Sequence, residues 1–423
     1  MKFVIFSILT ICGISHTLAG NFKQEYYQNV HMLSQQNSKC LEPLNKIQNS
    51  GELRALADCE LITGSIHVTN YEADILDLGK IKTIKGDFIV TNVSSLKVIQ
   101  ASELESIGGE FDLDTLTSLT SLSLSKLQAV ETLKWHVLPI LTQVTFSKGI
   151  NQIKSITMSD TSLTGITGFN VDTLKSMTIN NNRFLEWVES SVTEITGELS
   201  ISANADNLRV SMPNLVSVKG ITVKDTEEVD FHELQTIEHN GDFINNNFRE
   251  LKLPKLKSAG HTLSIIKNKM LSTIDMNSLT EVGGGLIIVD NSKVEKIDFF
   301  SSLKSVGGAI EFRGDITDNK FNSLKIVRGS AILNSSSSQF DCKKWMTNEV
   351  SKVVRGGKIE CSSGEKGTEI MLIDKNGEIT ETRQSNNGKN KSGYLAKSSA
   401  NIPYIPPLLG MILGIFISTF VQI

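Results

Sequence analysis

The 423-residue chain is poor in the residue types that mark several common protein classes. Aromatic residues make up 6% of it, and it contains only 7 prolines and 5 cysteines. No basic block suggests nucleic-acid binding, and the charges behind the formal net charge of −4 are scattered through both halves. No ten-residue stretch inside its central part carries an apolar stripe of period 3.6, which argues against long helices. The abundant Ser, Thr, Asn, Leu, Ile and Val instead favour many short strands joined by polar turns.

Both ends carry apolar segments that we interpret as processing signals. Residues 1–19 start with a lysine, continue as a short apolar run and end in small residues, as a secretory signal peptide does. Residues 401–423 form an apolar tail behind the polar residues 362–400, a pattern that predicts a removed glycosylphosphatidylinositol (GPI) signal. A tail-anchored transmembrane protein is the alternative, although no basic residues follow the tail. The residues that could carry the anchor are Ser398, Asn390, Ser392 and Gly393.

One short phrase recurs through the interior of the chain. It consists of Ile or Val, one residue, Gly, one residue, and then two apolar residues separated by one. Clear copies are Ile84–Val90, Val282–Ile288 and Val306–Phe312. An apolar anchor precedes each copy, and most anchors follow one another after 22 to 24 residues, although the register blurs between Leu127 and Val192. A repeat of this period indicates a solenoid.

The spacing within each repeat predicts strands rather than helices. Alternating apolar residues mark strands of three to five residues with one buried face, and the glycine permits a sharp corner between anchor and strand. We therefore predict an all-β fold in which residues 59–341 form about a dozen stacked coils of parallel strands. A leucine-rich-repeat solenoid is the rival fold, because Leu119–Leu124 partly fits its pattern.

Asn or Asp follows many of the first strands by two or three residues. Stacked at one corner, such side chains can hydrogen-bond turn amides from coil to coil. A row of ligand-binding or catalytic carboxylates is the alternative, but most members are neutral amides, so we favour a structural ladder. The members of this row are Asn92, Asp160, Asn181, Asn204, Asp225, Asn247, Asn268 and Asp290.

The cysteines outside the expected signal peptide form two pairs of equal spacing. Four cysteines in a secreted chain point to disulfides, and three pairings are possible. A dozen coils at about 4.8 Å each would separate the two pairs by roughly 60 Å, whereas disulfide-bonded Cα atoms lie within about 7 Å. We therefore expect one bridge in an N-terminal cap, residues 20–58 with the first coil, and one in a C-terminal cap, residues 342–361. These cysteines are Cys40, Cys59, Cys342 and Cys361.

Several of these phrases resemble known families. The segment Cys59–Val68 resembles the opening of a receptor L-domain, as in insulin- and epidermal-growth-factor-type receptors. Leu-x-x-Val-Gly-Gly at Leu279 and Leu303, and Leu-Pro-x-Leu at Leu253, resemble the GPI-anchored yeast cell-wall group that includes sporulation-specific, protoplast-secreted and "extracellular mutant" proteins. The resemblance covers about residues 40–361 and both terminal signals.

This resemblance implies a fold, a place and a role. It implies a right-handed parallel β-helix of receptor L-domain type, on the outer face of the plasma membrane or in the cell wall. It also implies a role in wall assembly and integrity, and in some members in the spore wall. The chain departs from such proteins in lacking a long Ser/Thr-rich stalk, and Glu369–Thr382 instead resembles a hairpin around Asn376 and Gly377.

No arrangement of residues indicates an enzyme, a metal site or a cofactor site. The acidic cluster of Glu227, Glu228 and Asp230 is expected on a solvated turn rather than around a substrate. Three tryptophans, Trp135, Trp187 and Trp345, could stack on sugar, but lone aromatic residues are more often core or cap residues. We therefore expect a non-catalytic wall protein whose partners are the membrane, through its lipid, and cell-wall glucan or mannoprotein. An adhesin or receptor-like module that binds a glycan or a protein is the alternative.

Three Asn-x-Ser sequons are candidates for N-glycosylation in a secreted protein. Asn92 and Asn334 are expected on solvent-facing turns. Asn390 counts only if it survives processing of the anchor signal.

Overall fold

The computed structural model describes residues 38–364 and 367–385. The expected signal peptide, the sequon at Asn390 and the proposed anchor residues lie outside the described residues. In the described part of the chain, no helix has both the length and the apolar character needed to cross a bilayer.

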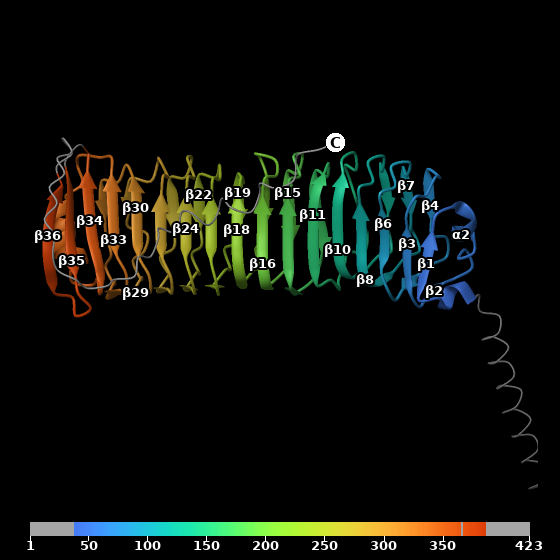
Figure 1. The fold of residues 1–423 in the computed structure, drawn as a ribbon, viewed down its shortest axis with the longest axis horizontal. Coiled ribbons are helices and arrows are strands. Elements are labelled where there is room, and N and C mark those ends of the chain that lie inside the picture. The colour runs from blue at the N-terminus through green and yellow to red at the C-terminus, as the bar shows by residue number, and fades with distance from the viewer. Residues whose placement is uncertain (1–37, 365–366, 386–423) are drawn as a thin grey trace, which may run out of the picture. The chain divides into compact units, whose positions relative to one another are not determined.

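The described residues make about 13 turns of a β-solenoid, which confirms the predicted fold class (Figure 1). Most coils contribute a short strand and, after a bend, a longer strand to one main sheet, and many then add a strand on a second face. The leucine-rich-repeat alternative is wrong, because the helical segments described are all of six residues or fewer. They are η1 (Ser38–Leu41), α2 (Ser50–Arg54), α3 (Cys342–Lys344) and η2 (Trp345–Val350).

The main sheet has 25 strands, which pair in parallel from coil to coil until the last two pairings. Its short strands are β2 (Leu61–Ile62), β5 (Thr83–Ile84), β13 (Thr173–Leu174), β20 (Thr236–Ile237), β23 (Ser258–Ala259), β26 (Glu281–Val282), β29 (Ser305–Val306) and β32 (Ile326–Val327). Its longer strands are β1 (Leu44–Ile47), β3 (Ser65–Val68), β6 (Phe88–Thr91), β8 (Ser106–Asp114), β10 (Ala129–Leu138), β11 (Ser155–Thr161), β14 (Ser176–Asn180), β16 (Glu194–Ser202), β18 (Ser217–Lys224), β21 (Gly241–Ile244), β24 (Leu263–Ile266), β27 (Leu286–Val289), β30 (Ile310–Gly314), β33 (Ala331–Ser335), β34 (Gly357–Ser363), β35 (Thr368–Ile373) and β36 (Ile379–Ser385). In the coils of β8, β10, β16 and β18 the short and the longer strand are joined into one long strand, and the coil of β11 forms the longer strand alone.

The second face consists of four smaller sheets, all parallel. One of them has four strands, one has three, and the other two have two strands each. Their strands are β4 (Ile75–Asp77), β7 (Val98–Gln100) and β9 (Ser121–Ser123); β12 (Gly165–Phe169), β15 (Trp187–Ser190), β17 (Arg209–Ser211) and β19 (Glu228–Asp230); β22 (Glu250–Lys252) and β25 (Thr273–Asp275); and β28 (Lys296–Ile297) and β31 (Asp318–Asn319).

Glycines mark the bend between the short and the longer strand because the coils touch there through their backbones. A Cβ added to Gly307 would lie 2.0 Å from the carbonyl oxygen of Gly283, and a Cβ on Gly283 would lie 2.0 Å from that of Gly260. No side chain fits at that distance, so the recurring glycine of the sequence is a requirement of close stacking.

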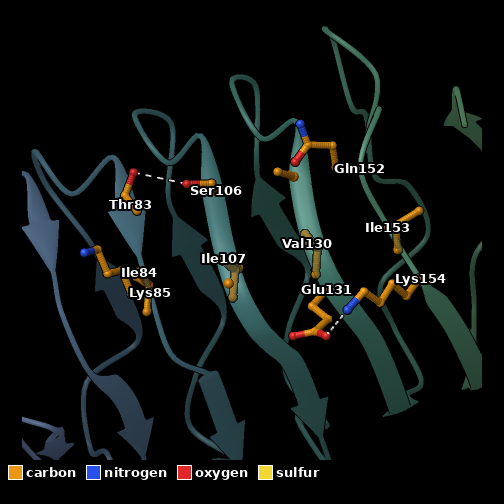
Figure 2. A pocket seen from close by; sticks show the side chains of 12 residues that line it. Thr83, Ile84, Lys85, Ser106, Ile107, Val130, Glu131, Gln152, Ile153 and Lys154 are labelled. Atoms are coloured by element: carbon orange, nitrogen blue, oxygen red, sulfur yellow. Dashed lines mark hydrogen bonds and ion pairs between the residues drawn. The ribbon is translucent and has the colours of Figure 1, made fainter.

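The bend also leaves a trough of about 530 Å³ along the N-terminal coils (Figure 2). Its floor is aliphatic, formed by residues such as Ile84 and Ile107, which are almost fully buried. Polar side chains on its rims bond to one another across adjacent coils. Thr83 accepts a hydrogen bond from Ser106 at 3.1 Å, and Lys154 pairs with Glu131 at 2.5 Å.

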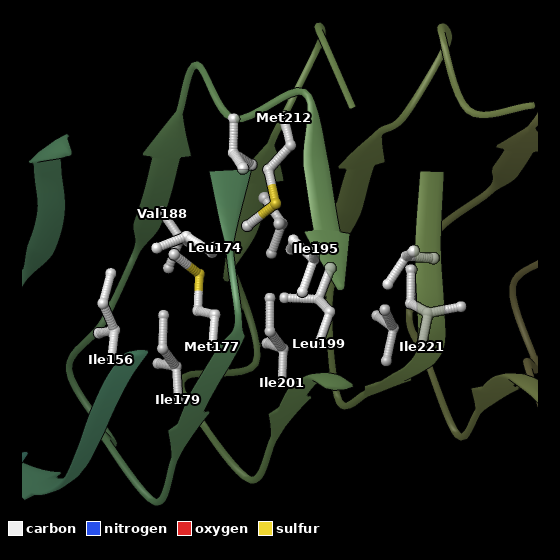
Figure 3. Packing of buried hydrophobic residues seen from close by; sticks show 14 of the residues in the cluster. Ile156, Leu174, Met177, Ile179, Val188, Ile195, Leu199, Ile201, Met212 and Ile221 are labelled. Carbon is white, nitrogen blue, oxygen red and sulfur yellow. The ribbon is translucent and has the colours of Figure 1, made fainter. Parts of the chain in front are cut away.

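The core consists of aliphatic rows that run through the stack in register (Figure 3). One such row places Ile156, Met177, Leu199 and Ile221 on successive strands, and all four are buried. A one-residue slip would turn a whole row outward, so burial fixes the register of each coil.

The blurred part of the repeat contains two coils of ordinary construction. Ile150 and Val171 are buried in the anchor position, between Leu127 and Val192. In these two coils a serine follows the short strand where other coils carry the glycine, and the phrase is one residue shorter. The loss of glycine and the shorter phrase together hid the pattern.

A ladder of buried polar side chains runs along one corner of the later coils. Thr161, Asn182, Asn204, Thr226, Asn246, Asn268 and Asn291 are all buried there. Each follows a residue with positive φ, and several of those are the expected Asn and Asp residues, such as Asn181 at 57° and Asp225 at 56°. Coil-to-coil hydrogen bonding is confirmed, but of the eight expected residues only Asn204 and Asn268 belong to the buried ladder. Asp160, Asn181 and Asp225 each precede one of its residues, and their side chains bond from coil to coil at the surface. Asn247 is wrong as a member, because it is exposed and lies one residue beyond the ladder.

Each end of the stack carries a disulfide, in the pairing expected from the sequence. Cys40 bonds to Cys59 beside α2, and Cys342 bonds to Cys361 beside η2. After the second bridge, β35 and β36 form the expected hairpin around Gly377, which has a φ of 91°. The hairpin extends the main sheet: β35 pairs antiparallel with β34 and reverses the strand direction, and β36 pairs antiparallel with β35 and restores it.

Candidate functional site

The four-stranded sheet of the second face presents an alternating surface. On β15 the side chains of Val188 and Ser190 are buried, so those of Trp187 and Glu189 point outward. The register aligns Gly165, Trp187, Arg209 and Glu228 across the four strands. One residue row of this surface therefore comes from four successive coils.

Trp187 lies over a glycine of the preceding coil. A Cβ built on Gly165 would lie 2.0 Å from Cε2 of the Trp187 indole, so only glycine leaves room for the ring in this position. The residue is nevertheless 40% exposed. The indole is therefore supported from below by the coil and remains open to solvent.

The other two tryptophans are core and cap residues, as expected. Trp135 is fully buried in a column of aromatic rings, 5.7 Å from Phe111 between ring centroids. Trp345 packs in the C-terminal cap, 6.2 Å from Phe340. The expectation of a buried role is wrong for Trp187 alone. The sequence did carry a signal for the exposure of Trp187: in a strand, side chains alternate between the two faces, so a residue next to an inward-facing valine points outward.

A hollow of about 610 Å³ opens beside Trp187. It is formed by side chains of three adjacent coils and contains both acidic and amide groups. Its lining residues are Glu186, Trp187, Glu189, Asn207, Arg209, Val210, Ser211, Glu227, Glu228 and Asp230. The acidic cluster expected on a turn is therefore partly on a strand, β19, and its carboxylates face this hollow.

Arg209 is the single cation of the hollow. Its Nε lies 3.7 Å from Glu228 and 4.0 Å from Glu227, at distances that leave the carboxylates open to further hydrogen bonds. The carboxylate of Asp230 accepts a hydrogen bond from Nδ1 of His232 at 2.7 Å. All of these groups are substantially exposed, so each ion pair contributes little to stability.

A second exposed aromatic residue lies three positions before Trp187. Phe184 is 54% exposed. Among the large hydrophobic residues that are exposed in the described part of the chain, Phe184 and Trp187 are the aromatic ones. Both belong to the same coil. The arrangement as a whole can bind a partner by stacking and by hydrogen bonds from carboxylate, amide and guanidinium groups.

The surroundings of His232 do not form a nucleophilic triad. Its Nδ1 contacts Asp230, while its Nε2 lies 3.8 Å from Glu233, a further carboxylate. Among the described residues, no group of three or more His, Cys, Asp or Glu is placed to hold a metal ion.

The sequons lie in different environments. Asn92 is exposed in the turn after β6, with a φ of 53°. Asn334 lies within β33, is partly buried and accepts a hydrogen bond from Ser362 at 3.1 Å. Glycosylation at either residue stays a prediction, and the geometry favours Asn92.

Two aspartates on the outward side of the main sheet are perturbed by burial. Desolvation raises the pKa of Asp112 on β8, and the neighbouring Asp114 and Glu110 raise it further. Desolvation likewise raises the pKa of Asp242 on β21, against the effect of a hydrogen bond with Ser264. They lie in different coils, so they do not form a catalytic pair.

Comparison with known proteins finds close relatives in fungi. The chain is 40% identical to "Sporulation-specific protein 22" of Saccharomyces cerevisiae over 88% of its length and 82% of the relative. It is 38% identical to "Sporulation-specific protein 2" of the same yeast, over 87% and 74% of the two chains. It is 33% identical to "Cell surface GPI-anchored protein" of Arthroderma benhamiae, over 74% and 81%.

More distant relatives include "Cell wall mannoprotein PST1" of Saccharomyces cerevisiae. None of the relatives described here has a name that denotes an enzyme. No family model matches the chain, and no solved structure gives a significant match.

Proposed function

Because the chain belongs to the fungal family of GPI-anchored cell-surface, cell-wall and sporulation-specific proteins, we propose that it is a non-catalytic protein of the fungal cell wall. It is carried through the secretory pathway and held by a GPI lipid at the outer face of the plasma membrane or in the wall. There it supports the assembly and integrity of the wall, and the two sporulation-specific relatives favour the spore wall.

The observation that carries this proposal is the extent of the similarity to the sporulation-specific relatives. At 40% identity over 88% of the chain, the matched region includes most of the solenoid. The surface of this solenoid is a set of repeated, mostly polar strands with one aromatic hollow, as suits a scaffold or a binding surface. Wall glucan and mannoprotein are the partners that we propose.

Deletion of the gene tests the proposal. Strains lacking it and its paralogues should become sensitive to dyes that bind the wall, or should form spores that are easily lysed. Re-expression of the intact chain should restore resistance, whereas a chain without residues 401–423 should restore it poorly, because it lacks the anchor signal. Normal walls and normal spores in the multiple deletion strain would refute the proposed function.

The alternative of an adhesin-like or receptor-like module is favoured by one observation only. Trp187 and Phe184 expose aromatic surface that the fold does not need to expose. Binding of a wall glycan at this position is compatible with a role in wall assembly. The two functions differ in the source of the ligand: a wall scaffold binds the wall of its own cell, whereas an adhesin binds another cell. Cells that assemble normal walls without the protein but fail to attach to other cells would favour the adhesin.

A further inference from the structure

We infer that the hollow beside Trp187 binds an oligosaccharide of amino sugars in which the amino groups are protonated. This inference rests on the proposed function and deepens it, since it names the chemical class of ligand for a wall protein. Three observations on the same surface carry it: a supported and exposed indole, an excess of carboxylates, and a strand register that repeats polar groups from coil to coil.

The indole of Trp187 has the geometry of a stacking platform. One side of the ring lies over Gly165, where a Cβ would approach to 2.0 Å, and 40% of the residue remains exposed. Sugars present C–H groups on one side of the ring, and such groups pack on aromatic faces while the hydroxyl groups point sideways. The backbone of the preceding coil thus holds the platform rigid before any ligand arrives.

Polar residues continue from Trp187 onto the next two strands. Arg209 and Glu228 continue the row of Trp187 on the next two strands, and Glu189, Ser211 and Asp230 form a parallel row. Adjacent strands lie about 4.8 Å apart, so these rows offer hydrogen-bonding groups at a regular step. An extended oligosaccharide that crosses the coils meets a new pair of polar groups at each strand.

The charge of the hollow selects among sugars. Its lining contains five carboxylates, from Glu186, Glu189, Glu227, Glu228 and Asp230, against the single guanidinium of Arg209. The whole chain has a formal net charge of −4, so outside the hollow acidic and basic residues are equal in number. The hollow is therefore a local negative site. Electrostatic complementarity favours a cationic ligand, and the exposed indole face adds attraction for an ammonium group.

Two further hollows of the described solenoid lack this combination. The trough near Ile84 has an aliphatic floor, and its rim pair Lys154 and Glu131 are bonded to each other. A third hollow, of about 460 Å³, contains Arg313, Asn334 and small residues without any aromatic ring. The amino-sugar site is thus assigned to the hollow beside Trp187, which combines an exposed ring with an excess of carboxylates.

Binding measurements with defined hexasaccharides test the inference. The full-length protein, purified in detergent from fungal membranes and wall extracts, is titrated with the hexamer of glucosamine, the hexamer of N-acetylglucosamine and a neutral β-linked glucose hexamer. We expect the glucosamine hexamer to bind about tenfold more tightly than the other two. Its affinity should fall several-fold when salt is raised from about 50 to about 500 mM, because salt screens exposed charges.

Variants locate the site. Trp187→Ala should weaken binding about tenfold, the size expected for loss of one aromatic stack. Glu227→Gln with Glu228→Gln should weaken binding of the glucosamine hexamer and remove much of its salt dependence. Glu281→Gln with Glu295→Gln is the matched control, since it removes two exposed carboxylates elsewhere on the solenoid and should leave binding unchanged. Trp187 is exposed, so its removal should not impair folding, which circular dichroism and the melting temperature will verify.

Each outcome has a defined meaning. Absence of binding by the glucosamine hexamer, or equal binding by Trp187→Ala, overturns the site. Equal binding of the acetylated or neutral hexamer overturns the assignment to amino sugars. The proposed function is judged separately by gene deletion: a wall defect combined with no hexamer binding overturns this inference alone, whereas no wall defect overturns the proposed function whatever the hexamers do.

Discussion

Asn246 and Asn268, one coil apart, share a pair of hydrogen bonds in the buried corner of the solenoid. The backbone nitrogen and Nδ2 of Asn246 both donate to Oδ1 of Asn268, at 2.9 and 3.0 Å. Asn268 repeats the pattern toward Asn291, and its own Nδ2 also donates to the carbonyl of Phe243 at 2.9 Å. A single side chain thus bonds to two neighbouring coils.

This relationship predicts that Asn268→Ala destabilises the C-terminal coils. The change leaves the backbone N–H of Asn246 without an acceptor in a buried site, which costs about 1–3 kcal/mol. It also removes one of the two hydrogen bonds of Asn246 Nδ2, which keeps the carbonyl of Val223. The bond of the Asn268 side chain to Asn291 is lost as well. We expect a loss of roughly 3 kcal/mol in the unfolding free energy and faster amide exchange in β24 and β27. Asn247→Ala is the control, because Asn247 is exposed. Equal effects of the two variants would contradict a supporting role for the ladder.

Close stacking at the bend predicts that Gly307→Ala is harmful. Its Cβ would lie 2.0 Å from the oxygen of Gly283, so two coils would have to move apart, at a cost of about 1–3 kcal/mol. Gly285→Ala is the matched control, since a Cβ there would have its nearest neighbour at 3.4 Å. Thermal unfolding of both variants measures the difference, and a normal melting temperature for Gly307→Ala would show that the stack is looser than described.

The disulfides predict separate effects at the two ends. Replacement of Cys342 and Cys361 by serine opens a loop with a sequence separation of 19 and should cost about 3 kcal/mol. Amide exchange should accelerate in β33 and β34 while β3 and β6 stay protected, because the coils are coupled mainly to their neighbours. Peptide mapping of the native protein should link Cys40 to Cys59. Any link from Cys40 to Cys342 would contradict the solenoid.

Burial of Asp112 predicts a pH-dependent loss of stability. Its pKa is raised in the folded protein, chiefly by desolvation, so the folded state holds the proton more tightly than the unfolded state. Stability is lost as the pH rises through the window between the unfolded pKa, about 3.9, and the raised folded value.

Asp112→Asn should therefore raise the melting temperature at pH 7 and have little effect below about pH 3.5. Asp114→Asn is the comparison, since Asp114 lies two residues further along the same strand. A fall in the melting temperature of Asp112→Asn at pH 7 would mean that the ionised carboxylate is stabilising, contrary to its burial.

Glycosylation is predicted at Asn92 in preference to Asn334. Asn92 is exposed in a turn, whereas Asn334 is partly buried in β33 and bonded to Ser362. Asn92→Gln should lower the mass of the secreted protein by one glycan, and Asn334→Gln should change it less. Intact-mass analysis before and after enzymatic deglycosylation distinguishes the two positions, and an unchanged mass for Asn92→Gln would refute the preference.

Much of the fold could be predicted because the relevant signals are local. The glycine before each longer strand and the spacing of anchors such as Leu256 and Leu279 lie within a single repeat. Ile150 and Val171 were missed because their coils replace that glycine by serine. Asn246 was missed because the ladder residue follows a residue of positive φ, and only the turn geometry shows which of several adjacent asparagines points inward.

The candidate site could not be predicted for a different reason. Its residues come from three coils. The packing of Trp187 on Gly165 depends on the pairing of β12 with β15, and these strands lie where the sequence repeat is hard to recognise. Glu228 and Asp230 were identified as an acidic cluster, but their partners Glu186 and Glu189 lie about two coils earlier in the sequence. Only the stacking of coils brings these groups together.

The hairpin of β35 and β36 affects how the C-terminal end of the stack can associate with other molecules. A stack that ended in a bare parallel strand would present a row of free amide and carbonyl groups on which the first coil of a neighbouring molecule could dock, and repetition of that contact would build fibres. Here β35 runs opposite to the strands of the coils, β36 returns to their direction, and this last strand carries a Glu381–Arg383 ion pair at 2.5 Å. Charged side chains on an edge strand disfavour such docking, so the hairpin protects this end of the stack against growth into fibres.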